Sequence, residues 1–176
     1  MKKGNWVIAL AGGAVVAAAA YNFLSDDMPK GAVPVYPFDK QRYLGTWNEI
    51  ARMPSWIEKN LTQLTENYTL IDDDTIRVVT KAYNTKSKKW IEILGRIKSA
   101  KAADLGMLKV SYFGPVYLSY NVLGIDPDYK YALVSGSGLS YLWILSKEKS
   151  IPDDIKSQFL TIAKNIGFNT DKLEWM

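Results

Sequence analysis

Two glutamates have the clearest potential for proton chemistry in this chain. Glu49 and Glu66 lie in short alternating segments that predict β-strands, on the faces expected to point inward. Burial would raise the pKa of each carboxyl group, and such a pair can act as a general acid and a general base. We favour a second interpretation, in which both are buried polar groups satisfied by hydrogen bonds, because no pair of carboxylates or tyrosines has a spacing diagnostic of catalysis.

The residue types that the chain lacks exclude most other chemistry. There is no histidine and no cysteine among the 176 residues. Their absence removes Ser-His catalysis, thiol nucleophiles, disulfides and cysteine-ligated zinc, and leaves unclustered carboxylates as metal ligands. We therefore expect neither an enzyme nor a metal or cofactor site.

The charge and composition favour a folded domain without a nucleic-acid partner. Formal net charge is +4, and the lysines are scattered rather than gathered in a basic stripe or nucleic-acid motif. Weak attraction to anionic lipid head groups remains an alternative to an ordinary solvated surface, which we favour. Hydrophobic residues make up 48% of the chain, enough to build a core.

Residues 1–24 predict a targeting segment. Two lysines precede a stretch from Trp6 to Leu24 that carries no charge. A signal peptide cleaved after Ala18-x-Ala20 and a signal anchor retained as a transmembrane helix both remain open, and we favour the anchor because the apolar run continues past the alanines. In either case the basic end stays cytoplasmic, so we expect the rest in the cell envelope, on the periplasmic or extracytoplasmic side.

A short linker is predicted between this segment and the folded domain. Residues 25–37 contain three prolines and one glycine. This composition predicts an extended tether outside the core, followed by a domain over residues 38–176.

The middle of the chain predicts antiparallel β-structure. Eight segments alternate between apolar and polar residues and are joined mostly by short turns, which favours a sandwich or a closed barrel. The predicted strands cover residues 45–51, 64–70, 76–84, 90–98, 106–114, 117–126, 130–137 and 141–147.

One amphipathic helix is predicted at residues 151–168. Pro152 suits its first turn and Gly167 its end. We expect its apolar face to pack on the outside of the last strands, for example against Leu142 and Ile144. That face comprises Ile155, Phe159, Ile162, Ala163 and Ile166.

Three motifs in order resemble the lipocalin family. They are a G-x-W motif at Gly45 and Trp47, a D-x-x-Y motif ending at Tyr129, and an aromatic strand, YLWILSK, that ends in the cation Lys147. The resemblance spans about residues 38–175 and extends in detail to bacterial Blc-type lipocalins. It implies an all-β fold: an eight-stranded antiparallel up-and-down barrel, with one C-terminal α-helix packed outside and here an N-terminal transmembrane or signal helix.

The resemblance also implies a barrel floor made by Gly45, Trp47 and Lys147. In the family, an arginine after the last strand packs across the tryptophan, and Lys147 can keep the cation–π contact without the guanidinium fork. Blc-type members usually carry a lipobox cysteine, which this chain lacks, so a transmembrane anchor would replace the lipid anchor. Dimers are a further implication of the resemblance.

Alternation predicts which side chains line the barrel. For residues 90–98 the register of family members puts Leu94 and Arg96 inward, whereas alternation alone equally allows Ile93 and Ile97. The predicted ligand-binding residues are Trp143, Tyr141, Tyr120, Val122, Tyr112, Val110, Tyr68, Glu66, Val78, Thr80, Arg96 and Val134.

An apolar and aromatic lining, with hydroxyl groups and Arg96 near the mouth, suits an acyl chain with a polar head. With the resemblance, it predicts a membrane-tethered protein that binds, stores or transports a fatty acid or lysophospholipid. One alternative is a module that docks a membrane protein or forms a homodimer through the mouth loop with Trp56 and Ile57. An enzyme based on carboxylates and tyrosines is a weaker one. Plain core filling is the competing interpretation of each predicted lining residue.

Overall fold

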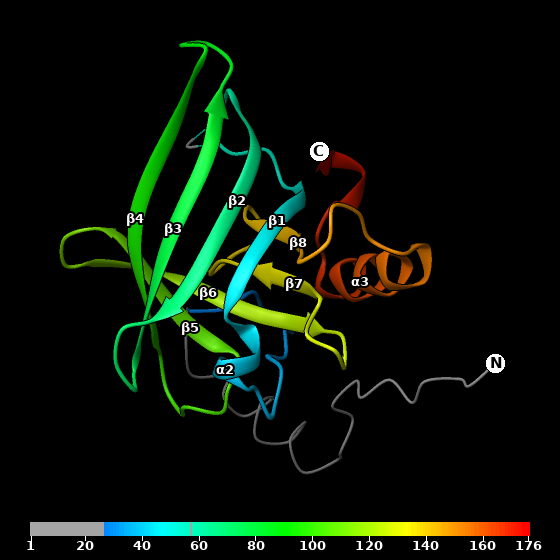
Figure 1. Cartoon of the computed structure of the whole chain (residues 1–176). Helices are drawn as coiled ribbons and strands as arrows, with labels where there is room; N and C mark the ends of the chain where they lie inside the picture. The colour runs from blue at the N-terminus through cyan, green and yellow to red at the C-terminus, as the bar shows by residue number, and fades with distance from the viewer. Residues whose placement is uncertain (1–26, 57) are drawn as a thin grey trace.

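A closed barrel of antiparallel strands with one helix on its outside is the architecture of the chain (Figure 1). The computed structural model describes residues 27–56 and 58–176. The predicted signal peptide or transmembrane anchor at residues 1–24 lies outside these ranges. Within them, no helix has the length and apolar character needed to cross a bilayer.

The strands follow one another as an up-and-down meander. Each is paired antiparallel with its neighbour, and β1 pairs with both β2 and β8, so that the sheet closes on itself. The eight-stranded antiparallel barrel is thus confirmed, and every predicted strand is present. Their bounds are β1 (Gly45–Arg52), β2 (Leu61–Leu70), β3 (Thr75–Asn84), β4 (Lys89–Ser99), β5 (Met107–Phe113), β6 (Val116–Ile125), β7 (Tyr131–Ser135) and β8 (Leu142–Ser146).

Three short elements were not predicted. Helix α2 (Lys40–Tyr43) precedes β1, and a 3-10 turn, η1 (Thr170–Lys172), follows the main helix. The two-residue strand β9 (Glu174–Trp175) pairs with the end of β1. The chain's C-terminus is thereby held beside the last residues of β1.

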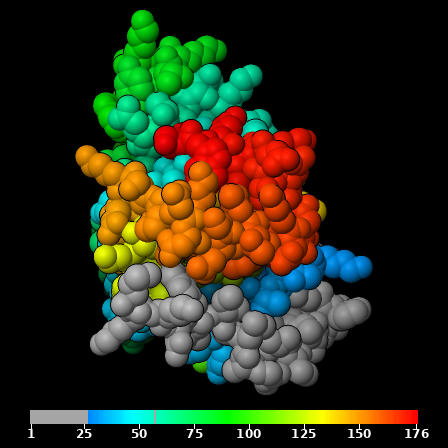
Figure 2. Space-filling view, turned by 90° about the vertical axis from the view of Figure 1, so that its right-hand side faces the viewer, coloured from blue at the N-terminus to red at the C-terminus, as the bar shows by residue number. Residues whose placement is uncertain are grey.

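The predicted helix is α3 (Asp153–Ile166), and its packing is confirmed. Phe159 and Ala163 are buried in one cluster with Leu142 and Ile144, on the outer face of the barrel. Figure 1 shows α3 outside the barrel beside β7 and β8. In Figure 2, α3 and the C-terminal segment lie side by side and cover this face of the molecule.

Residues 27–37 pack on the barrel, so the prediction of a tether outside the core is wrong for them. Met28 and Ala32 are buried in the cluster that α3 covers. The Val35 N–H donates to the Val122 carbonyl at 2.8 Å, and the Val35 carbonyl accepts from the Gly106 N–H at 2.9 Å. The segment begins with a turn, in which the Ala32 N–H donates to the Pro29 carbonyl at 3.0 Å. Its part around Val35 is hydrogen-bonded to the barrel, which composition alone does not predict.

The closed end of the barrel is plugged by Trp47. Its indole is fully buried, and Nε1 donates to the Tyr43 carbonyl at 2.8 Å. Lys147 Nζ lies 5.0 Å from the centroid of the Trp47 ring and donates to the Arg42 carbonyl at 2.8 Å. Gly45 has φ +105°, a conformation that glycine adopts without strain, and it lets the chain turn from α2 into β1. The structure therefore places Lys147 across Trp47, as the resemblance implied.

Replacing Lys147 with methionine should lower the free energy of unfolding by about 1–2 kcal/mol, because the stem remains while the cation–π contact and one hydrogen bond are lost. Urea unfolding measures this change. Lys149→Met, at an exposed position two residues on, is the matched control and should change stability by less than about 0.5 kcal/mol. Equal effects of the two substitutions would show that the contact with Trp47 contributes nothing specific.

Candidate ligand-binding site

The inward-facing side chains form a cluster separate from the one under α3. Most of the predicted ligand-binding residues belong to it or touch it, which shows their direction but does not test ligand binding. Tyr141 reaches it through Trp143, whose ring it stacks on at 5.9 Å between centroids. The predicted ligand-binding residues that belong to the interior cluster or pack directly on it are Tyr68, Val78, Val110, Tyr112, Tyr120, Val122, Val134 and Trp143.

The inward direction predicted for Arg96 is wrong. Its side chain is exposed, and Leu94 on the same face is 63% exposed. Ile97 is instead 1% exposed and belongs to the interior cluster. The register decides this, because Ile97 pairs directly with the buried Ile76 of β3 and must share its face. The alternation with Ile93 and Ile97 inward is therefore the right one.

The interior is filled at the floor and accessible above it. Tyr68 and Val78 expose 1% or less of their surface. Glu66, Tyr112 and Trp143, in contrast, are only half-buried although they face inward. An inward side chain that water can reach indicates open space inside the barrel. Core filling therefore describes the side chains near the closed end, and the interpretation as a ligand lining stays a prediction for those above them.

Glu66 lies at the centre of a network of hydroxyl groups. The Tyr68 hydroxyl donates to Oε2, while the Thr80 and Tyr112 hydroxyls donate to Oε1, each at 3.3 Å. The Tyr68 hydroxyl also lies 3.0 Å from that of Tyr120. Desolvation raises the pKa of Glu66, and the donated hydrogen bonds offset part of the rise. The interpretation of Glu66 as a satisfied buried polar group fits these contacts.

Gly95 makes room for one member of this network. A Cβ at this position would lie 2.8 Å from both Tyr112 Cδ1 and Val78 Cγ1, which is closer than side chains tolerate. The missing side chain of β4 thus lets the Tyr112 ring of β5 lie across the strand, with its hydroxyl on Glu66.

Arg52 is a charged interior residue that the sequence analysis missed. Its side chain is 5% exposed, and Nη1 donates to Glu49 Oε1 at 2.8 Å. Nη2 donates to the backbone carbonyls of Glu58 and Leu61 at 3.2 and 2.8 Å. The guanidinium thereby ties the end of β1 to the loop before β2 and to the first residue of β2.

A β-bulge explains why alternation failed at Arg52. Strict alternation from Trp47 and Glu49 would place Ala51 inward. Between Glu49 and Ala51 the pairing of β1 with β8 shifts by one residue, so that Arg52 lies opposite Trp143. Ala51 faces outward instead, in the cluster under α3. A bulge reverses the faces of all residues that follow it in the strand.

Glu58, in the loop at the mouth, is the second missed residue. Its Oε1 accepts a hydrogen bond from Trp143 Nε1 at 3.1 Å. Its Oε2 is buried and has no hydrogen-bond partner among the described residues. Burial raises the pKa of Glu58, and the indole N–H and the Arg52 guanidinium offset part of the rise. Only the position of a loop in three dimensions brings this carboxyl group to the barrel.

Glu49 completes a set of acidic groups along one side of the interior. Burial and the neighbouring Glu58 carboxylate raise the pKa of Glu49 to about 8, although the contact with Arg52 favours its ionised form. Glu66 adds a further repulsion. The three carboxyl groups therefore share a poorly solvated space in which protonation of one affects the others.

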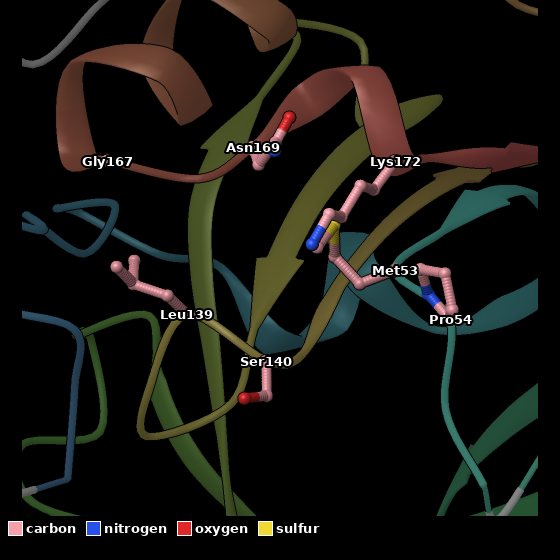
Figure 3. Close-up of a pocket in the computed structure, with 7 residues that line it drawn as sticks. All are labelled: Met53, Pro54, Leu139, Ser140, Gly167, Asn169 and Lys172. Carbon is pink, nitrogen blue, oxygen red and sulfur yellow. The ribbon is translucent and has the colours of Figure 1, made fainter.

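Hollows among the described residues lie outside the barrel. One, of about 480 Å³, lies between the loop after β1, the loop before β8 and the end of α3; Figure 3 shows the Lys172 and Met53 side chains pointing toward each other in it. The other, of about 1110 Å³, is an apolar groove between residues 31–42 and α3. Neither is lined by the interior glutamates. No group of acidic side chains in the described ranges is arranged to hold a metal ion.

Comparison with known proteins identifies the family. The family model described as "Lipocalin-like domain" matches residues 38–176. The chain belongs to the lipocalin family. It is 43% identical to the outer membrane lipoprotein Blc of Citrobacter freundii over 167 residues, which cover 92% of this chain and 94% of the relative. The Blc protein of Escherichia coli strain K12 is 41% identical over the same shares.

This lipocalin is thus of the bacterial Blc type, as the motifs indicated. A solved structure supports the fold: insecticyanin from the tobacco hornworm Manduca sexta matches with a TM-score of 0.69 at 21% identity, over 84% of each chain. Membership in the family, together with the partly open interior, supports a protein that binds a small hydrophobic ligand.

The free energy of unfolding should fall as the pH rises from about 5 to about 8. The folded-state pKa values of the interior glutamates are raised, so the native state keeps protons that the unfolded chain releases, and each group contributes a slope of up to ~1.4 kcal/mol per pH unit. Urea unfolding at several pH values measures the slope. Glu66→Gln should flatten it, and Glu92→Gln, an exposed glutamate of β4, should not. Stability that increases across this window would contradict the assignment of raised pKa values.

Proposed function

We propose that this lipocalin binds one single-chain amphiphile, a fatty acid or a lysophospholipid, inside the barrel, and stores or transports it in the cell envelope. The observation that supports this most directly is the half-buried state of Trp143, whose ring faces the interior yet keeps accessible surface. Tyr112, which also packs on the interior cluster and keeps accessible surface, supplies further apolar contact area for an alkyl chain.

Burial of the alkyl chain supplies enough free energy to bind such a ligand. Each methylene group moved out of water contributes ~0.8 kcal/mol, so a dodecyl chain contributes about 10 kcal/mol. Association costs remove at least ~4 kcal/mol. The remainder corresponds to a dissociation constant on the order of tens of micromolar before any head-group contact is added.

The mouth of the barrel favours exchange of the ligand with a membrane. Exposed apolar side chains occur in a loop and at two strand ends on this side: Trp56 is 82%, Phe113 77% and Trp90 61% exposed. The β3–β4 hairpin that carries Trp90 also contains exposed lysines, and its Thr85 N–H donates to the Asn60 carbonyl of the mouth loop at 2.9 Å. Aromatic residues next to lysines suit the surface of an anionic bilayer.

The location in the cell envelope rests on the relatives, which are outer membrane lipoproteins by name. Attachment through residues 1–24 as a transmembrane anchor is part of the proposal. The interior carboxyl groups are not assigned to catalysis: Glu49 accepts a hydrogen bond from Arg52, Glu66 accepts from three hydroxyl groups, and Glu58 accepts from the Trp143 indole.

Organic extraction of the purified full chain should recover a single-chain lipid, and Trp143→Ala should weaken binding of an added acyl ligand about ten-fold or more. Trp143 is half-buried, so the same substitution should leave most of the stability intact. Tryptophan quenching titrations and urea unfolding measure the two effects. Trp90→Ala, on the outside of the β3–β4 hairpin, is the matched control.

Equal loss of stability and binding in Trp143→Ala would mean that Trp143 is a core residue and not a ligand contact. Absence of any lipid together with a concentration-dependent dimer would favour the alternative of an interaction module. Turnover that disappears in Glu66→Gln would favour the enzyme.

Vesicles test the role of the mouth. Ligand transfer from vesicles containing anionic phospholipid should be several-fold faster than from uncharged ones, and Trp56→Ser should slow it. Ile71→Ser, which removes a 46% exposed apolar side chain at the closed end, should leave the rate unchanged. A rate that depends neither on vesicle charge nor on Trp56 would contradict uptake through the mouth.

A further inference from the structure

The apolar groove between residues 31–42 and α3 is large enough to hold a peptide segment. Its volume of about 1110 Å³ exceeds the ~300–1,000 Å³ that is typical of pockets for one small ligand. Its walls come from residues 31–42, from β6 and from α3. The apolar side chains among them include Val33, Phe38, Leu123, Ile125, Phe159 and Ile162.

Part of the apolar surface in this groove is in contact with water. Val33 is 38% and Tyr36 43% exposed. On α3, the residues that pack directly on the barrel are buried, whereas Ile162 and Ile166 lie on the groove side of the helix and are only half-buried. A contiguous apolar surface of this kind favours a partner that removes it from water.

The chain itself contains a segment with matching chemistry. From Trp6 to Leu24 it carries no charged side chain, and Asn22 is the only strongly polar one. This segment lies outside the described residues, which begin at Asp27. An uncharged and largely apolar peptide suits walls that offer mainly aliphatic and aromatic side chains.

The described chain begins close to the groove. The Asp27 carbonyl accepts a hydrogen bond from Asn121 Nδ2 at 2.9 Å. Leu123, in the groove wall, follows Asn121 by two residues on β6, a distance of about 7 Å along the strand. Leu24 precedes Asp27 by three residues, which span at most about 10 Å. In Figure 2 the segment that starts at residue 27, in blue, lies next to α3.

Covalent attachment favours this segment over a second copy of the protein. A short linker gives the attached segment an effective concentration on the order of millimolar. A second copy must instead lose its translational and rotational freedom on binding. At micromolar protein concentration, the attached segment is therefore the favoured occupant.

We propose that the groove between residues 31–42 and α3 binds the chain's own apolar segment, Trp6–Leu24, whenever that segment is not in a bilayer. The inference rests on one part of the proposed function, the attachment to a membrane through residues 1–24. It does not depend on a ligand inside the barrel, because the groove lies on the outer face.

The segment then has two alternative positions, the bilayer and the groove. In the bilayer it anchors the protein. In the groove its apolar side chains are covered by the protein's own surface, so the full chain stays dispersed in water without detergent. A lipid carrier with such an anchor can leave one membrane and cross an aqueous space to another.

Thiol labelling tests the docked position, because the chain contains no cysteine of its own. Asn165→Cys places a thiol in the groove wall, and Lys164→Cys places one on the other side of α3, outside the groove. Each variant is prepared as the full chain, without processing and without detergent. The rate of alkylation by a maleimide is then measured, with and without phosphatidylglycerol vesicles.

Without vesicles, the thiol of Asn165→Cys should react at least ten-fold more slowly than that of Lys164→Cys. Adding Val33→Asp, which puts a charge into the groove wall, should raise the rate at least five-fold. Val16→Asp, which puts the same charge into the apolar segment, should do so equally. The matched controls are Ile71→Asp, at an exposed apolar residue outside the groove, and Asn5→Asp, just before the apolar segment. Neither should change the rate.

Vesicles should remove the protection as the segment moves into the bilayer, and the protein should float with them in a density gradient. Circular dichroism of each variant verifies that the barrel is folded. Sedimentation of the full chain at several concentrations distinguishes a docked monomer from an association between copies.

Several outcomes would overturn the inference. They are equal labelling rates at the two α3 positions, protection that Val16→Asp leaves intact, protection that vesicles leave intact, and protection that increases with protein concentration. Recovery of the native protein from cells with its N-terminus at residue 21 would also overturn it, because the occupant would then be removed.

Flotation separates this inference from the proposed function. A full chain that floats with vesicles but shows no protection in water would overturn the docked position and leave the membrane attachment intact. A chain that neither floats nor protects the groove would overturn both. Binding of an acyl ligand, measured through Trp143, is independent of either result.

Discussion

The pairing of β1 with both β2 and β8 is the constraint on which the rest of the structure depends. It closes the sheet, so no barrel strand is left with an unpaired edge, and it separates the alternating side chains into an enclosed interior and an outer face. Trp47 closes one end of that interior. Lys147, the residue that directly follows β8, lies over the Trp47 ring. The outer face is then left for α3 and residues 27–37, which form a second core.

Closure also creates the unusual electrostatics of the interior. Carboxyl groups and a guanidinium that would be well solvated on an open sheet are brought into one partly dry space. Burying charges costs free energy that a salt bridge such as Glu49–Arg52 offsets only in part, so these residues are a weak source of stability. Residues that contradict the local rule of an apolar interior are expected at functional sites, and here they lie near the half-buried Trp143, where we propose that a ligand binds.

The fold was predictable from the sequence and the site only in part. Alternation placed all eight strands, and helical periodicity placed α3 on Leu142 and Ile144. Arg96, whose direction was wrong, lies in a strand whose alternation is compatible with either register. Arg52, which was missed, lies beyond a bulge that interrupts the alternation. Residues 27–37 were misjudged because proline-rich composition predicts conformation but not whether the segment finds a surface to pack on.

The sequence by itself determined the type of fold, its closed end and the family, since strand alternation and the motif at Trp47 depend on residues close together in the chain. Only the tertiary structure decided that Glu58 and Arg52 reach the interior and that Arg96 does not. The physical reason is that a bulge, a register and the position of a loop are set by pairing between strands far apart in sequence. The charge of the interior is a sum over residues that meet only when the barrel closes.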